Sequence, residues 1–306
     1  MELYKVMEGE SAQAENVQVQ VFIPCFNSRT TLPKTIESIL AQTMKNYEVI
    51  LVDNASSDDS SSVFSAFDDD RFSVVRFEEH VSLGANFNRC IEMASAEYFC
   101  IMHADDEYEL NYLENMTNSL QNTPSASIAF CNANIIDEES CRRFSVKNEI
   151  KKMASKMKSE QYTGGKGVLW LADYNKVIAP SVMFRTSSKN LFGTYRKDLK
   201  FTLDWDLYFR ILQKGGEILH VNQTLFNYRI HKNQQTSALI ASMEKYYEMR
   251  TILDRIYADL DNLGLSLKSR KYRSLGLTIF MDALVDISSF NFYKAKQKFL
   301  FFKELN

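Results

Sequence analysis

Two adjacent carboxylates, Asp105 and Asp106, follow the apolar segment "EYFCIM" after two intervening residues, His103 and Ala104. Like charges side by side repel each other and resist desolvation, so such a pair either lies in water or faces a cation. A hard cation such as Mg2+ or Mn2+ is bound by one or two carboxylates together with the phosphates of a substrate. From these residues alone the pair is either an exposed N-cap of the next helix or a metal-binding pair.

Two further polar clusters follow strand-like segments, "PCFN" at 24–27 and "DNASSDDS" at 53–60. Taken alone, Asp53 and Asn54 could simply open a turn, because Asx side chains bond to their own backbone. In open parallel sheets, however, ligands bind beyond the carboxyl ends of the strands. If the three strands are parallel neighbours, these clusters and "HADDE" at 103–107 converge on one sheet edge.

The elements that must position these clusters follow from the hydrophobic pattern. Short β-rich segments alternate with helix-like segments, and the latter carry apolar residues at helical spacing. This alternation predicts an α/β fold with a mostly parallel sheet and helices on both faces. The expected strands lie at 19–24, 47–53, 72–77, 97–102 and 127–132, and the expected helices at 32–42, 59–67, 84–95 and 109–120.

The pattern divides the chain into three parts. Residues 1–18 are polar and aperiodic and are predicted to be an N-terminal extension, and residues 19–237 form the main α/β domain. Within that domain the polar, Lys-rich stretch 138–165 predicts a long surface excursion or lid. Regular pattern resumes with "PSVMFR", "DWDLYFRILQKG", "GEILHV" and "TLFNYRI", and residues 238–306 predict a C-terminal helical subdomain.

The bulk composition excludes several classes of protein. Hydrophobic residues make up 45% and charged residues 25% of the chain, as in ordinary globular proteins, and a net charge of -3 gives no electrostatic reason to bind nucleic acid. The five cysteines are too far apart for a zinc knuckle or a redox motif, so we interpret them as reduced. Without a signal-like or membrane-spanning run, the chain is predicted to be cytoplasmic, with the inner membrane face as an alternative.

Residues 19 to about 236 resemble the family 2 glycosyltransferases, which have the Rossmann-like A-type nucleotide-sugar transferase fold. The resemblance rests on six segments in the order of that family, and it spans about two thirds of the chain. These segments are "VFIPCFNSRTTLPKTIESILAQT", "YEVILVDNASSDDS", "GANFNRCIEMASAEYFCIMHADD", "PSVMFR", "DWDLYFRIL" and "YRIHKNQQTS". The resemblance implies an inverting, metal-dependent transfer of a sugar from a nucleotide diphosphate, with a UDP-sugar favoured, to an acceptor hydroxyl.

The resemblance also assigns the nucleotide-binding residues. It places Pro24, Phe26 and Asn27 along the nucleobase pocket, with Asp53 accepting a hydrogen bond from the base. Asp105 would face the ribose or a metal-bound water.

The metal would be Mn2+ or Mg2+, and Asp106 would bind it. His231 matches a family position near the diphosphate and could ligate the metal or donate to a phosphate. Arg229 is interpreted as a support of the loop. Where many relatives have an earlier aspartate, this chain has His103, which we interpret as a packed or polar neighbour and not as a ligand.

Sugar transfer also requires a base, because the acceptor hydroxyl must lose its proton. Asp204 resembles the catalytic aspartate of the family and begins a predicted helix, whose positive dipole end would help to keep it ionised; a role as N-cap alone is the alternative. Relatives often carry Glu just before this aspartate, whereas here the residue is Leu203. Pro180, Ser181 and Trp205 are expected near the donor or acceptor.

Other classes of function remain open. A nucleotidyltransferase would need a Gly-rich basic loop after the first strand, which "PCFNSRT" lacks. A catalytically inactive sugar-nucleotide-binding or scaffold domain is the main alternative, because a fold alone does not give activity.

The resemblance leaves the acceptor as a glycan or a lipid-linked sugar of cell-surface polysaccharide or glycolipid synthesis. The chain end "SSFNFYKAKQKFLFFKELN" interleaves aromatics with lysines and could contact a membrane peripherally, pack on the catalytic domain or form a homodimer. As a helix it would scatter its aromatic residues around the circumference, which favours packing on protein. The aromatics are Phe290, Phe292, Tyr293, Phe299, Phe301 and Phe302, and the lysines are Lys294, Lys296, Lys298 and Lys303.

Overall fold

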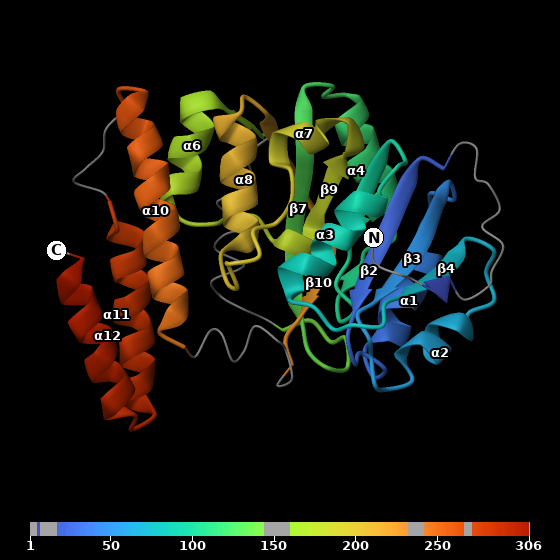
Figure 1. The fold of residues 1–306 in the computed structure, drawn as a ribbon, viewed down its shortest axis with the longest axis horizontal. Coiled ribbons are helices and arrows are strands. Elements are labelled where there is room, and N and C mark those ends of the chain that lie inside the picture. The colour runs from blue at the N-terminus through green and yellow to red at the C-terminus, as the bar shows by residue number, and fades with distance from the viewer. Residues whose placement is uncertain (1–4, 7–16, 144–159, 232–241, 266–270, 306) are drawn as a thin grey trace.

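A computed structural model describes residues 5–6, 17–143, 160–231, 242–265 and 271–305. Within these ranges the strands form one ten-stranded sheet in the order β1-β4-β3-β2-β5-β9-β7-β10-β6, with β8 pairing to β10 (Figure 1). The strands are β1 (Lys5–Val6), β2 (Val19–Cys25), β3 (Tyr47–Asp53), β4 (Phe72–Arg76), β5 (Tyr98–Ile101), β6 (Glu107–Tyr108), β7 (Ala126–Ile136), β8 (Glu160–Thr163), β9 (Val182–Arg185) and β10 (Glu217–Arg229).

The first half of the sheet is parallel. Strand β2 pairs in parallel with both β3 and β5, and β3 pairs in parallel with β4. Strands β2 and β3 are almost entirely buried, which matches their nearly continuous apolar sequences "VQVFIPC" and "YEVILVD". The predicted α/β class and the mostly parallel sheet are confirmed.

Helices cover both faces of this sheet. One face packs against α1 (Leu32–Leu40), α2 (Ser60–Ser65) and α4 (Tyr112–Gln121), and the other against α3 (Leu83–Met93), α6 (Gly164–Asp173) and α8 (Leu203–Gln213). Alternation along one strand shows the division, since Val21 and Ile23 belong to the first core and Phe22 to the second. Short helical segments η1 (Ala179–Ser181), η2 (Thr186–Ser188) and α7 (Lys189–Phe192) flank β9.

Several elements were not predicted. Strand β9 runs antiparallel to both β5 and β7, and the short strands β6 and β8 pair antiparallel with β10. The segments "GEILHV" and "TLFNYRI" join into one long strand, β10, whose pairing with β7 contains register shifts. Helix α6 begins inside the stretch that was predicted to be a lid. It was not predicted, because its three glycines and its single apolar turn give only a weak helical pattern. Residues 144–159 of that predicted lid lie outside the described residues.

The C-terminal part consists of α10 (Glu244–Asn262), α11 (Arg273–Ser288) and α12 (Phe292–Glu304). Helix α10 packs on α6 and α8, and α11 and α12 form an outer hairpin (Figure 1). Gly276 allows the close approach of these two helices, because a Cβ atom there would meet the Phe302 ring at 2.9 Å. The predicted boundary at residue 238 lies outside the described residues and stays a prediction.

Candidate active site

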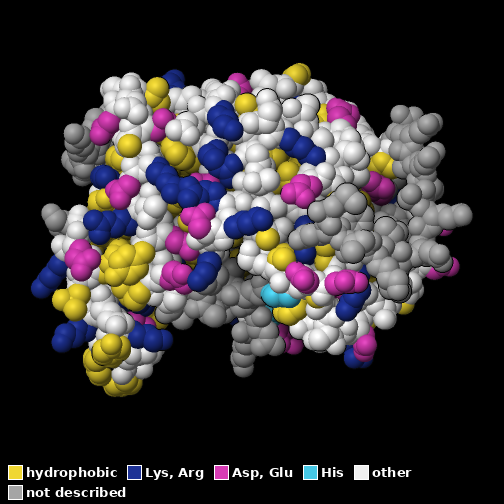
Figure 2. Space-filling view, in the orientation of Figure 1, with side chains coloured by type: hydrophobic (Ala, Val, Ile, Leu, Met, Phe, Trp, Pro, Cys, Tyr) yellow, Lys and Arg dark blue, Asp and Glu magenta, His cyan; other side chains and the backbone are white. Residues whose placement is uncertain are grey.

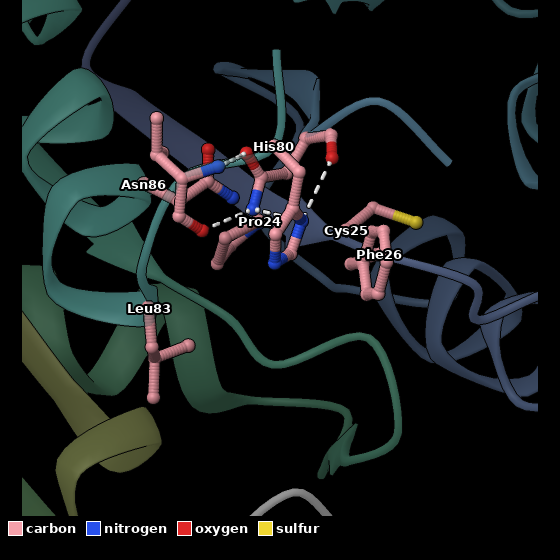
Figure 3. Close-up of a pocket in the computed structure, with 8 residues that line it drawn as sticks. Pro24, Cys25, Phe26, His80, Leu83 and Asn86 are labelled. Carbon is pink, nitrogen blue, oxygen red and sulfur yellow. Dashed lines mark hydrogen bonds between the residues drawn. The ribbon is translucent and has the colours of Figure 1, made fainter. Parts of the chain in front are cut away.

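A pocket of about 170 Å³ opens beyond the carboxyl ends of β2 and β3 (Figure 3). This is smaller than the roughly 300 Å³ or more of a site for a whole drug-sized ligand, so it suits one flat ring of a larger molecule. The rings of Phe26 and His80 lie with their centroids 4.1 Å apart. The lining residues are Pro24, Cys25, Phe26, Asn54, His80, Val81, Leu83 and Asn86.

Asn54 organises the wall of this pocket. Its side-chain amide donates to the Val81 carbonyl at 2.8 Å and lies 3.1 Å from Nδ1 of His80. Its Oδ1 accepts from the Val81 amide and from the buried Arg89 guanidinium, at 2.9 and 3.0 Å. These bonds fix the loop that follows β4, so the His80 ring is held in place before any ligand arrives.

Asp53 lies beneath the pocket, not on its surface. Its carboxylate is fully buried and accepts from the Ser56 amide at 2.9 Å, the Ser61 hydroxyl at 2.5 Å and the Arg76 guanidinium at 2.5 Å. Both oxygens are therefore engaged by the protein in this structure. The sequence prediction gave Asp53 a direct contact with the base, whereas the side chain that reaches the pocket from this strand end is Asn54.

Asn27 has a similar supporting position. It adopts a left-handed backbone conformation with φ of 52°, which asparagine tolerates better than most residues. Its Oδ1 accepts from the amides of Ser57 and Asp58 at 2.8 and 3.3 Å. Asn27 therefore ties the loop after β2 to the loop after β3, while Pro24 and Phe26 line the pocket itself.

The acidic pair lies beyond the end of β5. Side-chain ligand atoms of His103, Asp105 and Asp106 lie within 4.8 Å of one another. Asp106 is fully buried, and its Oδ2 has no hydrogen-bond partner although its Oδ1 accepts from the Arg229 amide at 2.8 Å. Burial and the neighbouring Asp105 both raise the pKa of the Asp106 carboxyl. The cluster thus contains a desolvated carboxylate oxygen directed at other potential ligands.

This geometry fits a divalent cation. Carboxylate oxygens suit Mg2+ and Mn2+, and an imidazole suits Mn2+ as well. An unpaired buried carboxylate oxygen is costly, and a cation would remove that cost. His103 belongs to this cluster, although its sequence position was interpreted as a packed neighbour, and its ring also stacks on Phe87 with centroids 5.6 Å apart.

His231 and Arg229 hold the loop that carries the pair. The His231 Nε2 atom lies 3.0 Å from Asp105 Oδ2, so in this structure His231 contacts Asp105 and not Asp106. The buried Arg229 guanidinium donates to the carbonyls of Asp105, Asp137 and Glu138 at 2.6 to 3.0 Å. Arg229 therefore supports the loop, as its sequence position suggested.

The pocket and the acidic cluster adjoin each other. Strands β2 and β5 are parallel neighbours with Phe22 opposite Ile101, so Pro24 and His103 follow them at the same edge. Helix α3 runs past both sites, since its Asn86 lines the pocket and its Phe87 stacks on His103. A ligand with a flat ring in the pocket could extend its remaining groups toward the acidic pair.

Asp204 lies in the first turn of α8. Its Oδ1 accepts from the Trp205 amide at 2.8 Å, and its Oδ2 accepts from the Asn175 side chain at 2.7 Å. Burial raises the pKa of Asp204 to about 6, and these two hydrogen bonds oppose the rise. A carboxylate with this pKa is ionised at neutral pH and is still basic enough to accept a proton.

Two ring contacts lead from the acidic cluster toward Asp204. Phe87 contacts His103 on one side and Tyr195 on the other, with ring centroids 5.6 and 5.3 Å apart. Burial raises the pKa of the Tyr195 phenol, and the charge of Asp204 raises it further. Asn88 of α3 holds Tyr195 by accepting from its amide at 2.6 Å and donating to its carbonyl at 2.9 Å.

The other residues predicted near the donor and acceptor are buried. Trp205 is 2% exposed and donates from Nε1 to the Leu171 carbonyl at 3.1 Å. Ser181 is fully buried and donates to the Ile178 carbonyl at 2.8 Å, and Pro180 is buried beside it. All three side chains are buried in this structure, and a contact with substrate stays a prediction.

Sequence reasoning missed His80, Asn86 and Asn175. His80 follows the third predicted strand, so the argument from strand ends could have found it. Asn86 lies within a predicted helix and Asn175 in an irregular segment, and neither has a local signal, because only tertiary packing brings Asn86 to the pocket and Asn175 to Asp204.

The open, mostly parallel sheet with acidic residues at its carboxyl edge defines a Rossmann-like protein of the A-type transferase class. The family model described as Glycosyl transferase family 2 matches residues 20–179. This chain therefore belongs to glycosyl transferase family 2, as its sequence motifs predicted, and it is a glycosyltransferase.

Curated relatives are also named glycosyltransferases. An uncharacterized glycosyltransferase of Rickettsia typhi is 26% identical over 229 residues, covering 74% of this chain and 69% of the relative. The glycosyltransferase GlyG of Streptococcus pneumoniae is 33% identical over 105 residues, covering 34% of this chain and 35% of that protein.

Two solved structures share the fold. TarS of S. aureus (residues 1–349), in complex with UDP-GlcNAc, has a TM-score of 0.64 at 16% identity, covering 94% of this chain and 90% of that one. The mannosyltransferase PcManGT of Pyrobaculum calidifontis, in complex with GDP-Man and Mn2+, has a TM-score of 0.60 at 15% identity, covering 93% and 74% respectively. Across the helices that the structure describes, none combines the length and hydrophobicity that a membrane span needs.

Proposed function

We propose that this protein transfers a sugar from a nucleotide-diphosphate donor to an acceptor hydroxyl with inversion at the anomeric carbon. The observation that carries the proposal is the buried Asp106 oxygen, which has no hydrogen-bond partner and lies 3.8 Å from Nδ1 of His103, in a cluster next to a pocket of ring size. The family name supports sugar transfer. The UDP-GlcNAc and GDP-Man complexes of its structural neighbours support a nucleotide-sugar donor, and we favour UDP.

In this proposal the nucleobase occupies the pocket between Pro24, Phe26 and His80, and the diphosphate extends toward Asp105 and Asp106. A bound Mn2+ or Mg2+ would neutralise the charge of the departing diphosphate. His103 and Asp106 offer ligand atoms for it, and His231 orients Asp105. That His231 also contacts the metal or a phosphate stays a prediction from the sequence.

Asp204 is proposed as the base. It would accept the proton of the acceptor hydroxyl as that oxygen attacks the anomeric carbon from the face opposite the leaving diphosphate. A single displacement of this kind inverts the configuration. Asp206, two residues further on, is excluded from this role by geometry, because it is buried and paired with Arg210 and Arg255 at 2.8 and 3.1 Å.

The acceptor is proposed to be a glycan or a lipid-linked sugar of cell-surface polysaccharide or glycolipid synthesis. Nothing in the site selects one of these, so the acceptor has to be found by screening. The donor side can be tested without it.

Donor binding should depend on metal. A panel of nucleoside diphosphates with Mn2+ is expected to raise the melting temperature, because a ligand that binds only the folded state stabilises it by about 2.7 kcal/mol at a concentration of 100 Kd. Differential scanning fluorimetry with and without EDTA measures this effect. A scaffold domain without donor binding would show no metal-dependent shift with any nucleotide.

The pH profile should report Asp204. Because the base must be ionised and its pKa is about 6, kcat/KM is expected to fall about tenfold per pH unit below that value and to level off above it. A profile without an acid limb between pH 5 and 7 would contradict Asp204 as the base.

Asn175 should set the position of that limb. Its side chain donates to the Asp204 carboxylate, so Asn175→Ala removes a bond that lowers the pKa and should move the acid limb to higher pH. The pH dependence of kcat/KM in the variant measures the shift. If Asn175 only supports the loop, the rate would fall equally at every pH and the limb would stay in place.

A further inference from the structure

The turn between α11 and α12 presents aromatic side chains to solvent. Phe290, Phe292 and Tyr293 are 83%, 62% and 72% exposed. Phe290 adopts a left-handed backbone conformation with φ of 58°, which is unfavourable for a bulky residue. Figure 2 shows hydrophobic side chains gathered at this end of the molecule beside Lys and Arg. Strain that directs a large apolar ring outward points to a function for the exposed ring.

Helix α11 extends this apolar surface. Its exposed face carries Leu277, Phe280, Met281, Leu284 and Val285 at helical spacing. Its opposite face is buried through Leu275, Ile279 and Ala283, so the helix is apolar on both sides. A helix that is apolar all round is normally covered on all sides, and here one side has no protein against it among the described residues.

Near the turn the charges are separated by sign. The acidic residues of α11 are Asp282 and Asp286, and the one acidic residue of α12, the exposed Glu304, lies at the far end of that helix from the turn. Asp282 and Asp286 pair with Lys245 and Lys298 at 2.7 Å, and both of these lysines are buried. The exposed charges near the turn, Lys294 and Lys296, are therefore positive.

The remaining aromatics of α12 behave differently. Phe301 is buried against Tyr246 and Tyr247, and Phe302 packs on Gly276. The aromatic residues of the chain end thus divide into two sets. In the packed set, Phe301 contacts α10 while Phe299 and Phe302 contact α11, and the other set is exposed at the turn. The prediction that they pack on protein holds for Phe301 and Phe302, and it does not hold for Phe290, Phe292 and Tyr293.

We propose that this turn inserts its aromatic side chains into the interface of an anionic lipid bilayer, with Lys294 and Lys296 at the level of the headgroups. Exposed aromatics next to cations, with the acidic groups turned inward, complement a negatively charged apolar boundary. In Figure 1 the turn lies on the same side of the molecule as the end of β10, near which the acidic pair lies, so docking would bring the candidate active site toward the membrane.

Cosedimentation of the full chain with vesicles tests this proposal. Binding is expected with vesicles of phosphatidylcholine mixed with phosphatidylglycerol, and it should weaken as salt is raised, because exposed charges are screened over about 10 Å at 0.1 M salt. Vesicles of phosphatidylcholine alone should bind much less. Equal binding to both vesicles, or binding to neither, would overturn the proposal.

Two double variants separate the apolar from the charged contribution. Phe290→Asn with Phe292→Gln removes two of the three exposed rings and relieves the left-handed strain, so it should fold normally and lower vesicle binding at least about tenfold. Lys294→Gln with Lys296→Gln should lower binding to anionic vesicles by about tenfold or more. The matched control Lys197→Gln with Lys214→Gln removes two exposed lysines elsewhere and should bind like the wild type.

The alternative is that a second copy of the chain covers this surface. Sedimentation equilibrium without lipid tests for such self-association. A monomer is expected. A dimer that the Phe290→Asn, Phe292→Gln variant dissociates would assign the surface to self-association and overturn the membrane proposal. These readouts are independent of the proposed reaction, because all the substituted residues lie outside its site and binding is measured without substrate.

Discussion

Asp204→Asn is expected to lower the rate of sugar transfer by a factor on the order of a hundred or more while leaving donor affinity nearly unchanged. This is the usual size of the loss when a general base is removed. The amide is isosteric with the carboxylate, and its single oxygen can still accept from the Trp205 amide, while the bond that Asn175 donates to the second oxygen is lost. With the cap of the helix preserved, the local structure should persist. The loss should therefore appear in kcat and not in the Kd of the donor.

Asp206 provides the matched control for this experiment. It lies in the same turn of α8, but its carboxylate is paired with Arg210 and Arg255. Asp206→Asn should lower the melting temperature, because two guanidinium groups lose their counter-charge, and it should retain turnover per folded molecule. If Asp204→Asn kept wild-type turnover, another group would have to be the base.

Asp106→Asn is expected to remove the metal-dependent part of nucleotide affinity, by a factor on the order of a hundred, since loss even of a supporting group around a metal costs 10- to 100-fold. Calorimetry of nucleoside diphosphate binding with and without Mn2+ measures the change. Unchanged metal-dependent affinity would contradict the assignment of Asp106 as a ligand.

The same substitution should not destabilise the protein in the absence of metal. The Asp106 Oδ1 atom accepts from the Arg229 amide, which an asparagine can preserve, while the unpaired buried Oδ2 is costly in the wild type. A melting temperature equal to or above that of the metal-free wild type would show that the lost affinity does not come from misfolding. A strongly lowered melting temperature would instead assign Asp106 a structural role.

The fold was largely predictable, because each strand in the parallel half of the sheet is a short apolar segment that can be recognised from the local sequence. Strand 47–53 was predicted with the bounds that the structure gives, and the strand at 19–24 is one residue longer in the structure. The antiparallel direction of β9 was not predictable, because its three apolar residues do not specify direction. Helix α6 was missed for a related reason, since "GGKGVLWLAD" has too short an apolar turn to distinguish a helix from a loop.

The site residues were predictable where a polar or acidic residue follows a predicted strand. They were less predictable where tertiary packing decides which side chain reaches the site. Asp105 and Asp106 occupy one compact cluster, as their adjacency suggested. Whether Asp53 or Asn54 lines the pocket could not be decided from residue type, because the two are neighbours at the same strand end. The structure decides it through Arg76, which lies 23 residues further along the chain and pairs with Asp53. His103 lies in the cluster because the backbone turns after β5. That turn cannot be predicted from the residue type at this position.

The central claim is metal-dependent transfer with inversion, and it can be tested without knowledge of the acceptor. Water can replace the acceptor, so a panel of α-linked UDP-sugars with Mn2+ should yield slow hydrolysis that proton NMR follows in time. The account predicts that the β-anomer of the free sugar is formed first and that EDTA or Asp204→Asn suppresses its formation. Release of the α-anomer first, or hydrolysis at the same rate in EDTA, would contradict it.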